Sequence, residues 1–179
     1  MLKKQSQLIH CSVMSKDGLH SILITATYGL HSIEDRKPLW AELQQLDNAT
    51  VPWLVMGDYN AVLNSGDRFN GSTVTDGEPR DFIHLLDSTD LLEIKSVGPY
   101  FSWSNKGSGT DRVMSRIYWA LGNSCWMNSY PSVVTEYLNP GISDHSPLMI
   151  TCHSSGQSGG RPFQFFNYII CAIIQTLKM

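Results

Sequence analysis

The pattern of hydrophobic and polar positions predicts short strands that alternate with amphipathic helices. Residues 19–28 alternate between the two faces of a strand and end at a tyrosine and a glycine. After them, Leu39, Leu43 and Leu46 recur at the spacing of one helix face, which predicts a helix capped by Asp35. This stretch therefore predicts a strand followed by a helix.

A short uncharged run, residues 53–56, stands at the centre of the pattern. It opens after a proline and ends at Gly57, which predicts a strand buried on both faces, although a piece of buried helix has the same pattern. Gly57 allows the chain to turn there or to approach another backbone closely. The polar residues that follow this run are therefore candidates for function.

The rest of the chain continues the alternation of elements. Residues 64–79 are rich in Gly, Asn, Ser, Thr and Asp and are expected to form a long loop. Further strands are expected at residues 100–103, 113–121, 133–138 and 148–152, and helices at residues 79–88 and 124–129. Strands outnumber helices and helices fall between strands, so the fold class is α+β with a layered sheet core.

Length and charge narrow the classes of function. A chain of 179 residues, 42% of them apolar, has room for one domain with a real core, or for one domain and a tail. The formal charge of −3 argues against a protein that coats nucleic acid non-specifically, but not against an enzyme that contacts a few phosphates through a metal ion. The cysteines are scattered without a CxxC pair, which indicates reduced thiols rather than a disulfide framework or zinc site: Cys11, Cys125, Cys152 and Cys171.

We expect one domain at residues 1–152, a Ser/Gly-rich linker at 153–160 and an apolar tail at 161–179. The tail has only about ten residues without a strongly polar interruption, whereas a membrane span needs about 20. The N-terminus leads into no apolar segment, so no signal peptide is expected. These features predict a nuclear or cytoplasmic protein without a membrane segment.

Two polar clusters are candidates for chemistry. Asp58 and Asn60 follow the central run and would point to one side if the chain stayed extended, which suits a hydrolytic site, although Gly, Asp and Asn are also common in tight turns. Asp144 and His145 stand just before an apolar strand, where a turn is again the ordinary interpretation. Together the clusters would suffice to bind a magnesium-type ion and activate water at a phosphodiester, but spacing alone does not show that they meet.

The motifs Gly57-Asp58-Tyr59-Asn60 and Ser143-Asp144-His145-Ser146-Pro147 resemble the endonuclease/exonuclease/phosphatase superfamily, which has the fold of pancreatic-type deoxyribonuclease. More closely, the chain resembles the endonuclease domain of plant non-LTR (long interspersed element) retrotransposons. Each motif is weak alone, and the ordered set is specific over roughly residues 7–166. The other matching stretches are residues 7–11, 25–29, 36–40, 80–82, 100–105, 116–121 and 161–163.

The resemblance implies a deoxyribonuclease-like two-sheet α/β sandwich and Mg²⁺-dependent cleavage of DNA phosphodiesters, with no organic cofactor. It assigns catalytic roles to Asp58 and Asn60, which position water and phosphate, to His145 at the phosphate, and to Tyr28, which contacts the phosphate. It places Asp144 at the metal, and Trp103 and Asn105 near the DNA strand.

Three departures from the family pattern predict an incomplete site. The early strands, which carry a metal-binding Asn and Glu, would precede residue 7, so the sandwich is expected to be partial and N-terminally truncated. The family's Arg-Leu-Asp-Arg is Arg116-Ile117-Tyr118-Trp119 here, so His145 lacks the carboxylate that orients it. Loss of such a partner typically costs about 10–100-fold. After Phe166 the sequence leaves the pattern, and no reverse-transcriptase region follows.

Three hypotheses follow from these departures. The first is a degenerate phosphodiesterase domain with little or no activity. The second is an active enzyme that draws its cation ligand from Glu34, Asp67 or Glu78. The third is a non-catalytic interaction module that self-associates through an exposed sheet edge.

Overall fold

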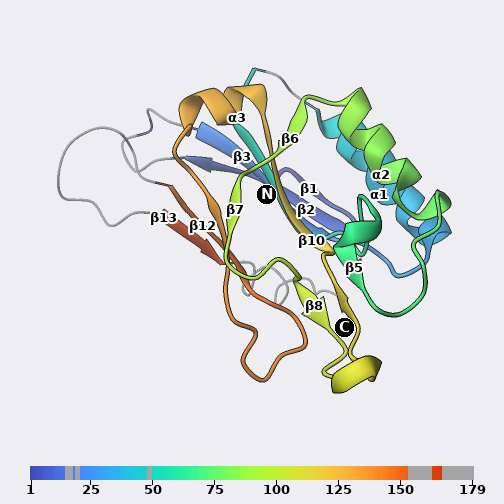
Figure 1. Cartoon of the computed structure of the whole chain (residues 1–179). Helices are drawn as coiled ribbons and strands as arrows, with labels where there is room; N and C mark the ends of the chain where they lie inside the picture. Colours follow the sequence, from blue (N-terminus) through green and yellow to red (C-terminus); the bar gives the residue numbers. More distant parts are fainter. Residues whose placement is uncertain (15–17, 19–20, 48–49, 153–162, 167–179) are drawn as a thin grey trace.

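The computed structural model describes residues 1–14, 18, 21–47, 50–152 and 163–166 (Figure 1). Its central layer is a six-stranded sheet with the order β1-β2-β3-β4-β10-β6. These strands are β1 (Lys3–Lys4), β2 (Leu8–Met14), β3 (Ser21–Tyr28), β4 (Trp53–Asp58), β10 (Tyr118–Asn123) and β6 (Leu91–Glu93). β3 and β4 pair in parallel, and β4 and β10 pair antiparallel.

A four-stranded sheet and a three-stranded sheet complete the β-structure. The four-stranded sheet has the order β13 (Phe163–Phe166), β12 (Leu148–Cys152), β11 (Thr135–Tyr137) and β7 (Ser96–Val97). The three-stranded sheet has the order β5 (Arg68–Phe69), β9 (Met114–Ser115) and β8 (Trp103–Ser104). The helices are α1 (Ile33–Leu46), α2 (Gly77–Ser88) and α3 (Ser124–Ser129), with 3-10 turns η1 (Ser65–Asp67) and η2 (Gly109–Asp111).

The central strand β4 separates two hydrophobic cores because its side chains alternate between the two faces of the sheet. Trp53 and Val55 pack in the core that contains α1 and α2. Leu54 and Met56 pack in the core that contains β11 and β12, on the opposite face. Figure 1 shows the resulting layers, with the two long helices on one side of the six-stranded sheet and β12 and β13 on the other. All six residues of β4 are buried, which confirms the sequence prediction of a strand covered on both faces.

Helix α1 makes the crossover between the parallel strands β3 and β4. Ser32 is its N-cap, and the Ser32 hydroxyl accepts a hydrogen bond from the Asp35 amide (3.1 Å). The expectation that Asp35 caps the helix is therefore wrong, because Asp35 already lies in the first turn and its carboxylate accepts from the Ser32 hydroxyl (2.6 Å).

Residues 113–121 do not form the single strand that their alternation predicts. They divide into β9 and β10, which belong to different sheets. The break falls where the Arg116 amide donates to the Asp67 carbonyl (2.7 Å) and the Ile117 amide donates to the Ser102 hydroxyl (2.9 Å). Non-local partners thus take the backbone groups that would otherwise continue one ladder.

β2 was not expected, and it carries a buried histidine. The Trp53 indole N–H donates to the Thr25 hydroxyl (2.8 Å), and the same hydroxyl lies 2.7 Å from His10 Nδ1. The Thr25 hydroxyl thus accepts from Trp53 and is also the hydrogen-bond partner of His10 Nδ1, so one hydroxyl links the two rings. Burial, and then the charge of Lys3, lower the pKa of His10. His10 is therefore a buried residue that supports the packing of the sheet.

The remaining findings concern the tryptophans, the C-terminal segment and the helices. Trp40, Trp53 and Trp126 are buried. The predicted linker at 153–160 lies outside the described residues, and of the predicted tail only β13 is described, where it pairs with β12. Among the described helices, none has the length and apolarity needed to cross a membrane.

Candidate functional site

Three adjacent strands place Tyr28, Asp58 and Tyr118 in one row across the six-stranded sheet. Asp58 ends β4, directly beside Tyr28 of β3 and directly opposite Tyr118 of β10. Asp58 lies two residues after Met56, and Tyr118 lies two residues before Ala120, so each pair points to the same face of the sheet. Met56 and Ala120 belong to the core between the two sheets. The row therefore faces the second sheet, where the segment leading into β12 passes.

The Asp58 carboxyl is almost completely buried, with 2% of the residue exposed. This burial raises the pKa of Asp58 to about 7, against the opposing effects of the Asn60 amide and of the Arg36 charge. The Asn60 N–H donates to Asp58 Oδ1 at 2.8 Å. A carboxyl with this pKa can hold or release a proton near neutral pH, which is a property of general acids and bases.

Asn60 does not extend the strand beyond Asp58. Its φ of 47° is left-handed, and its side-chain amide donates to the Gly29 carbonyl (2.8 Å). The Asp58 and Asn60 side chains therefore do not stand side by side as an extended chain would place them. The tight-turn interpretation of this stretch describes the backbone, and the turn is what brings the Asn60 N–H to the carboxylate.

Gly57 makes the close backbone approach that its position in the sequence allows. Its φ is +148°, and a Cβ atom there would lie 2.2 Å from the carbonyl oxygen of Thr27 on the neighbouring strand. Gly57 thereby lets β4 lie against β3 immediately before Asp58.

His145 reaches the same row from the segment before β12. Its ring stacks on that of Tyr118, with centroids 5.1 Å apart and an interplanar angle of 29°. Its backbone forms an isolated bridge with Trp103, and the next amide, that of Ser146, donates to the Ser102 carbonyl (2.7 Å). Two segments far apart in sequence therefore meet at Tyr118, which touches His145 and is the register partner of Asp58.

The His145 ring has weak polar support. Within the part of the chain that the structure describes, its buried Nδ1 has no hydrogen-bond partner. Its Nε2 lies 3.9 Å from Asp144 Oδ2. Burial lowers the pKa of His145, and the nearby Asp144 charge opposes this. A neutral ring with an unpaired Nδ1 lacks the partner that would fix its tautomer.

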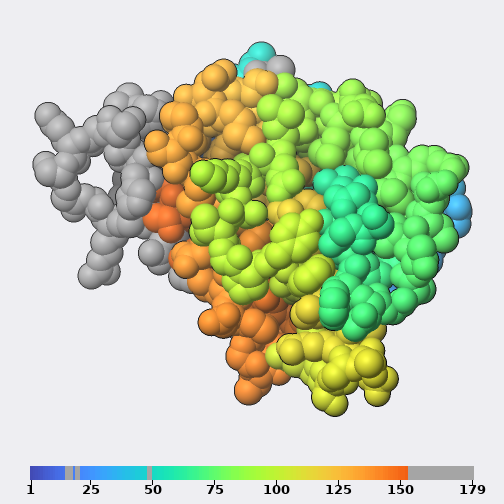
Figure 2. All heavy atoms as spheres, viewed as in Figure 1, coloured from blue at the N-terminus to red at the C-terminus, as the bar shows by residue number. Residues whose placement is uncertain are grey.

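The residues expected near DNA have local structural contacts. The Trp103 indole donates to Asp144 Oδ2 (3.2 Å). The Asn105 side chain accepts from the amides of Gly107 and Val113 (both 2.9 Å) and donates to the Asp111 carbonyl (2.9 Å). Asn105 thus builds the base of the turn that contains η2, which protrudes from the lower end of the molecule in Figure 2.

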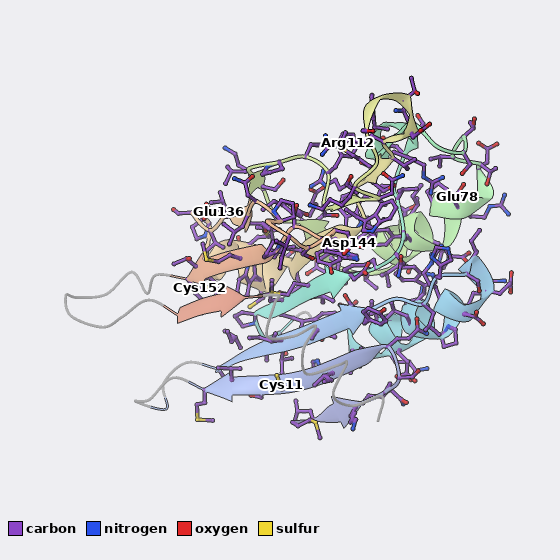
Figure 3. The ribbon with its side chains drawn as sticks, turned by 90° about the horizontal axis from the view of Figure 1, so that it is seen from below. Cys11, Glu78, Arg112, Glu136, Asp144 and Cys152 are labelled. Carbon is purple, nitrogen blue, oxygen red and sulfur yellow. The ribbon has the colours of Figure 1, made fainter. Side chains whose placement is uncertain are left out.

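The described residues do not fit a magnesium cage. Among them, no three His, Cys, Asp or Glu side chains gather where they could hold a metal ion. Asp144 is exposed over 55% of its side chain and lies well apart from Glu78 and Glu136 in Figure 3. Asp58 is enclosed, with one oxygen bonded to a backbone amide. We therefore derive no step through a metal ion from these residues.

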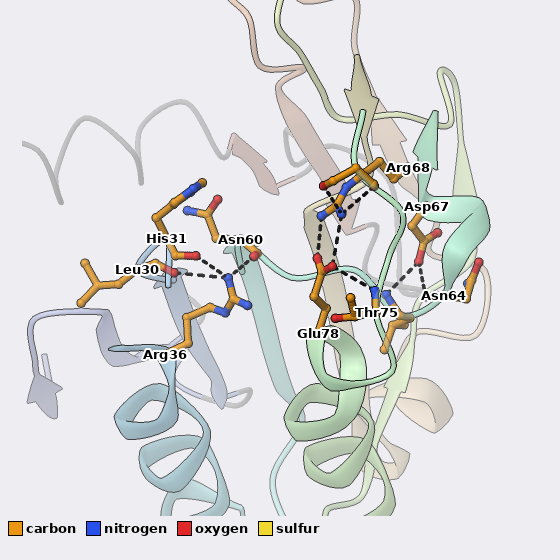
Figure 4. Close-up of polar contacts among 11 residues, drawn as sticks. Leu30, His31, Arg36, Asn60, Asn64, Asp67, Arg68, Thr75 and Glu78 are labelled. Carbon is orange, nitrogen blue, oxygen red and sulfur yellow. Dashed lines mark hydrogen bonds and ion pairs between the residues drawn. The ribbon is translucent and has the colours of Figure 1, made fainter. Parts of the chain in front are cut away.

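The alternative cation ligands already have protein partners. Asp67 is fully buried; its Oδ1 accepts from the Tyr100 hydroxyl (2.6 Å) and its Oδ2 accepts from the amides of Leu63 and Asn64 (2.8 and 3.0 Å). Glu78 pairs with Arg68 (2.8 Å), as Figure 4 shows, and Glu34 pairs with Lys37 on the surface of α1 (2.7 Å). These carboxylates stabilise loops and helix surfaces.

Sequence reasoning missed two residues that hold the site together. The buried Ser102 hydroxyl accepts from the amides of Ile117 and Tyr118 (2.9 and 3.0 Å), and its carbonyl accepts from Ser146. Arg36 binds the loops after β3 and β4. One signal for Arg36 is present in the sequence, since it lies three residues before Leu39 and therefore on the buried face of the helix.

No protein-family model matches this sequence, and no curated protein matches it. Among solved structures, the chain is similar to the endonuclease domain of TRAS1, a telomere-specific non-LTR retrotransposon, with a TM-score of 0.62 and 12% identity over 84% of this chain and 65% of that one. It is also similar to a beta toxin from Staphylococcus aureus, with a TM-score of 0.53 and 12% identity over 83% of this chain and 57% of that one. This chain thus spans less than two thirds of either protein. At such identities the likeness shows the fold alone, and that fold is the mixed α/β, deoxyribonuclease-like architecture.

Proposed function

We propose that this chain is a phosphodiester-hydrolase domain of retrotransposon origin, similar to the plant non-LTR endonucleases, whose site is degenerate and whose activity on DNA is weak or absent. The fold and the convergence of Asp58 and His145 support a nuclease-like ancestry. The state of the site supports the loss of activity.

The observation that carries this proposal is the Tyr118 ring stacked on His145. A tyrosine ring stands where a histidine base would need a carboxylate, and within the described residues His145 Nδ1 remains unpaired. Without a partner at Nδ1, the imidazole has no group to stabilise its charged form as it takes up a proton. The divalent cation that such chemistry uses also has no fitting set of described ligands.

Incubation of the purified chain with supercoiled plasmid DNA and Mg²⁺ tests the proposal. We expect nicking at or near the level of a buffer control, and no further loss in Asp58→Ala. Robust nicking that Asp58→Ala abolishes and EDTA suppresses would overturn the proposal and establish an active metal-dependent nuclease. Equal nicking in EDTA and in Mg²⁺ would argue against any role of a divalent cation.

A non-catalytic interaction module is the second candidate. Several large apolar side chains are exposed on the segments around the site: Phe69, Val97, Tyr100 and Ile142. Exposed apolar residues of this kind favour contact with another protein surface. We expect light scattering to show a population larger than the monomer at micromolar concentration, and replacing Ile142 with Lys to reduce it. A monomer with a cooperative melt would exclude self-association through this surface.

A further inference from the structure

Arg36 is a buried cation that binds only backbone carbonyls in its immediate surroundings. Its Nη1 donates to the carbonyls of Leu30 (3.5 Å) and His31 (3.0 Å) and makes a short contact with the carbonyl of Asn60 (Figure 4). It is 5% exposed and forms no ion pair with any of the residues that the structure describes. Glu78, Asp58 and Asp81 act on Arg36 through their charges without forming an ion pair with it. Burying a guanidinium without a carboxylate in contact is costly, and an apolar side chain would serve packing better.

The position of Arg36 explains what the charge does. Leu30 and His31 follow β3, and Asn60 follows β4, so one guanidinium ties together the ends of the two parallel strands that carry Tyr28 and Asp58. The same joint contains the hydrogen bond from the Asn60 side chain to Gly29, and another from the Gly29 amide to the Asp58 carbonyl (2.7 Å).

We propose that Arg36 is a positioning residue: by holding the Asn60 carbonyl, its guanidinium keeps Asn60 left-handed and its N–H directed at the Asp58 carboxylate. A non-glycine residue in the left-handed region needs its surroundings to keep it there. Arg36 supplies that constraint from outside the turn. The role of Asp58 as the reacting group rests on the proposed function, whereas the coupling between Arg36 and the Asn60 amide can be measured whether or not the chain cleaves DNA.

Hydrogen exchange and amide chemical shifts in the full chain test this coupling. In Arg36→Met we expect the protection of the Asn60 amide to fall about 10-fold or more, with an upfield shift of its proton, because its hydrogen bond to the Asp58 carboxyl is lost. The amide of Met56, in the middle of β4, serves as the internal reference for general loosening of the sheet. Arg36→Lys keeps the charge but not the planar fork, so it should restore the Asn60 signal only in part.

Arg68→Met is the control for the loss of an arginine, since Arg68 lies in β5 and pairs with Glu78, apart from Arg36 and Asn60 (Figure 4). It should leave the Asn60 amide unchanged. If Asn60 and Met56 protection fall together in Arg36→Met, or if Asn60 is unchanged, Arg36 is a structural residue and the proposal fails. If Arg36→Met does not fold, the same comparison of Asn60 and Met56 protection is made in Arg36→Lys. A positive plasmid assay would overturn the proposed loss of activity but would leave the measured coupling between Arg36 and the Asn60 amide unchanged.

Discussion

The ring of Tyr118 lies against the ring of His145 at a centroid distance of 5.1 Å, while the Tyr118 backbone pairs with that of Asp58. One aromatic residue therefore contacts His145 through its ring and pairs with Asp58 through its backbone. Tyr118 belongs to the hydrophobic core between the two sheets, and the His145 ring that it contacts has no hydrogen-bond partner at Nδ1 among the described residues.

Replacing Tyr118 with Asp should destabilise the fold without restoring activity. The change removes a buried ring and brings a second carboxyl beside Asp58, so we expect a loss of about 3 kcal/mol and a fall in Tm of roughly 6–12 °C. Thermal melts at pH 7 and the plasmid assay measure the two effects. Tyr118→Phe keeps the stacking and should lose at most about 1.5 kcal/mol. Strong nicking by Tyr118→Asp would show that the missing carboxylate was the sole defect.

The buried Asp58 predicts a specific pH dependence of stability. Its pKa rises from 3.8 to about 7 on folding, so between these values the unfolded chain gives up a proton that the folded chain retains. The contribution of Asp58 to the free energy of unfolding is therefore fully present below about pH 4 and is lost as the pH rises through about 7. Asp58→Asn can still accept the Asn60 N–H, and it should be more stable than the parent at pH 8 by up to about 4 kcal/mol.

Urea unfolding of both proteins between pH 4 and pH 8.5 measures this difference. The advantage of Asp58→Asn should grow with pH and level off above about pH 8. A constant difference over this range would mean that Asp58 ionises at its ordinary pKa in the folded chain.

The hydroxyl of Thr25 should matter more than that of another buried threonine. Thr25→Val leaves the Trp53 indole and His10 Nδ1 without their partner, so we expect a loss of about 2–4 kcal/mol. Thr135 is equally buried, but its hydroxyl has no partner within the described residues, so Thr135→Val should change stability by less than about 1 kcal/mol. Denaturant midpoints measure the stability of both variants. Equal losses of stability in Thr25→Val and Thr135→Val would contradict the shared role of the Thr25 hydroxyl.

Gly57 should tolerate no side chain. Its positive φ and the 2.2 Å that would separate an added Cβ from the Thr27 carbonyl oxygen predict that Gly57→Ala loses more than about 3 kcal/mol or fails to fold. Gly77, at the start of α2, has no atom within 4 Å of such a Cβ, and Gly77→Ala should be neutral or stabilise the protein by up to about 1 kcal/mol. Circular dichroism melts compare the two, and similar melting temperatures would contradict the close approach at Gly57.

The sequence predicts those elements whose pattern is local. Residues 124–129 and 148–152 have the bounds expected of them: Asn123, directly before the first of these elements, caps it, and the second is a short apolar run. β2 was missed because its inward positions include a polar residue, His10, whose burial depends on Thr25 from another strand. The division of residues 113–121 was missed because the partners that cause it, Asp67 and Ser102, are distant in sequence.

The site is predicted from the sequence only in outline. Resemblance brings Asp58 and His145 together and notes the tyrosine in place of an acidic residue, but no spacing rule says that this ring would stack on the histidine. The Arg36 contacts are to backbone carbonyls, which every residue carries, so residue identity gives no sign of them. The catalytic, DNA-contacting and metal roles of the individual residues remain predictions.

The passage of residues 113–121 from one sheet into another restricts the length of this segment. β9 is fixed by β5 and β8, and β10 is fixed by β4 and β6. An insertion of one residue at Arg116–Ile117 would turn β10 over, sending Trp119 toward the second sheet and Tyr118 toward the helices. Lineages of this fold should therefore accumulate insertions and deletions in surface turns such as 105–109, while this crossing keeps a constant residue count even as its side chains diverge.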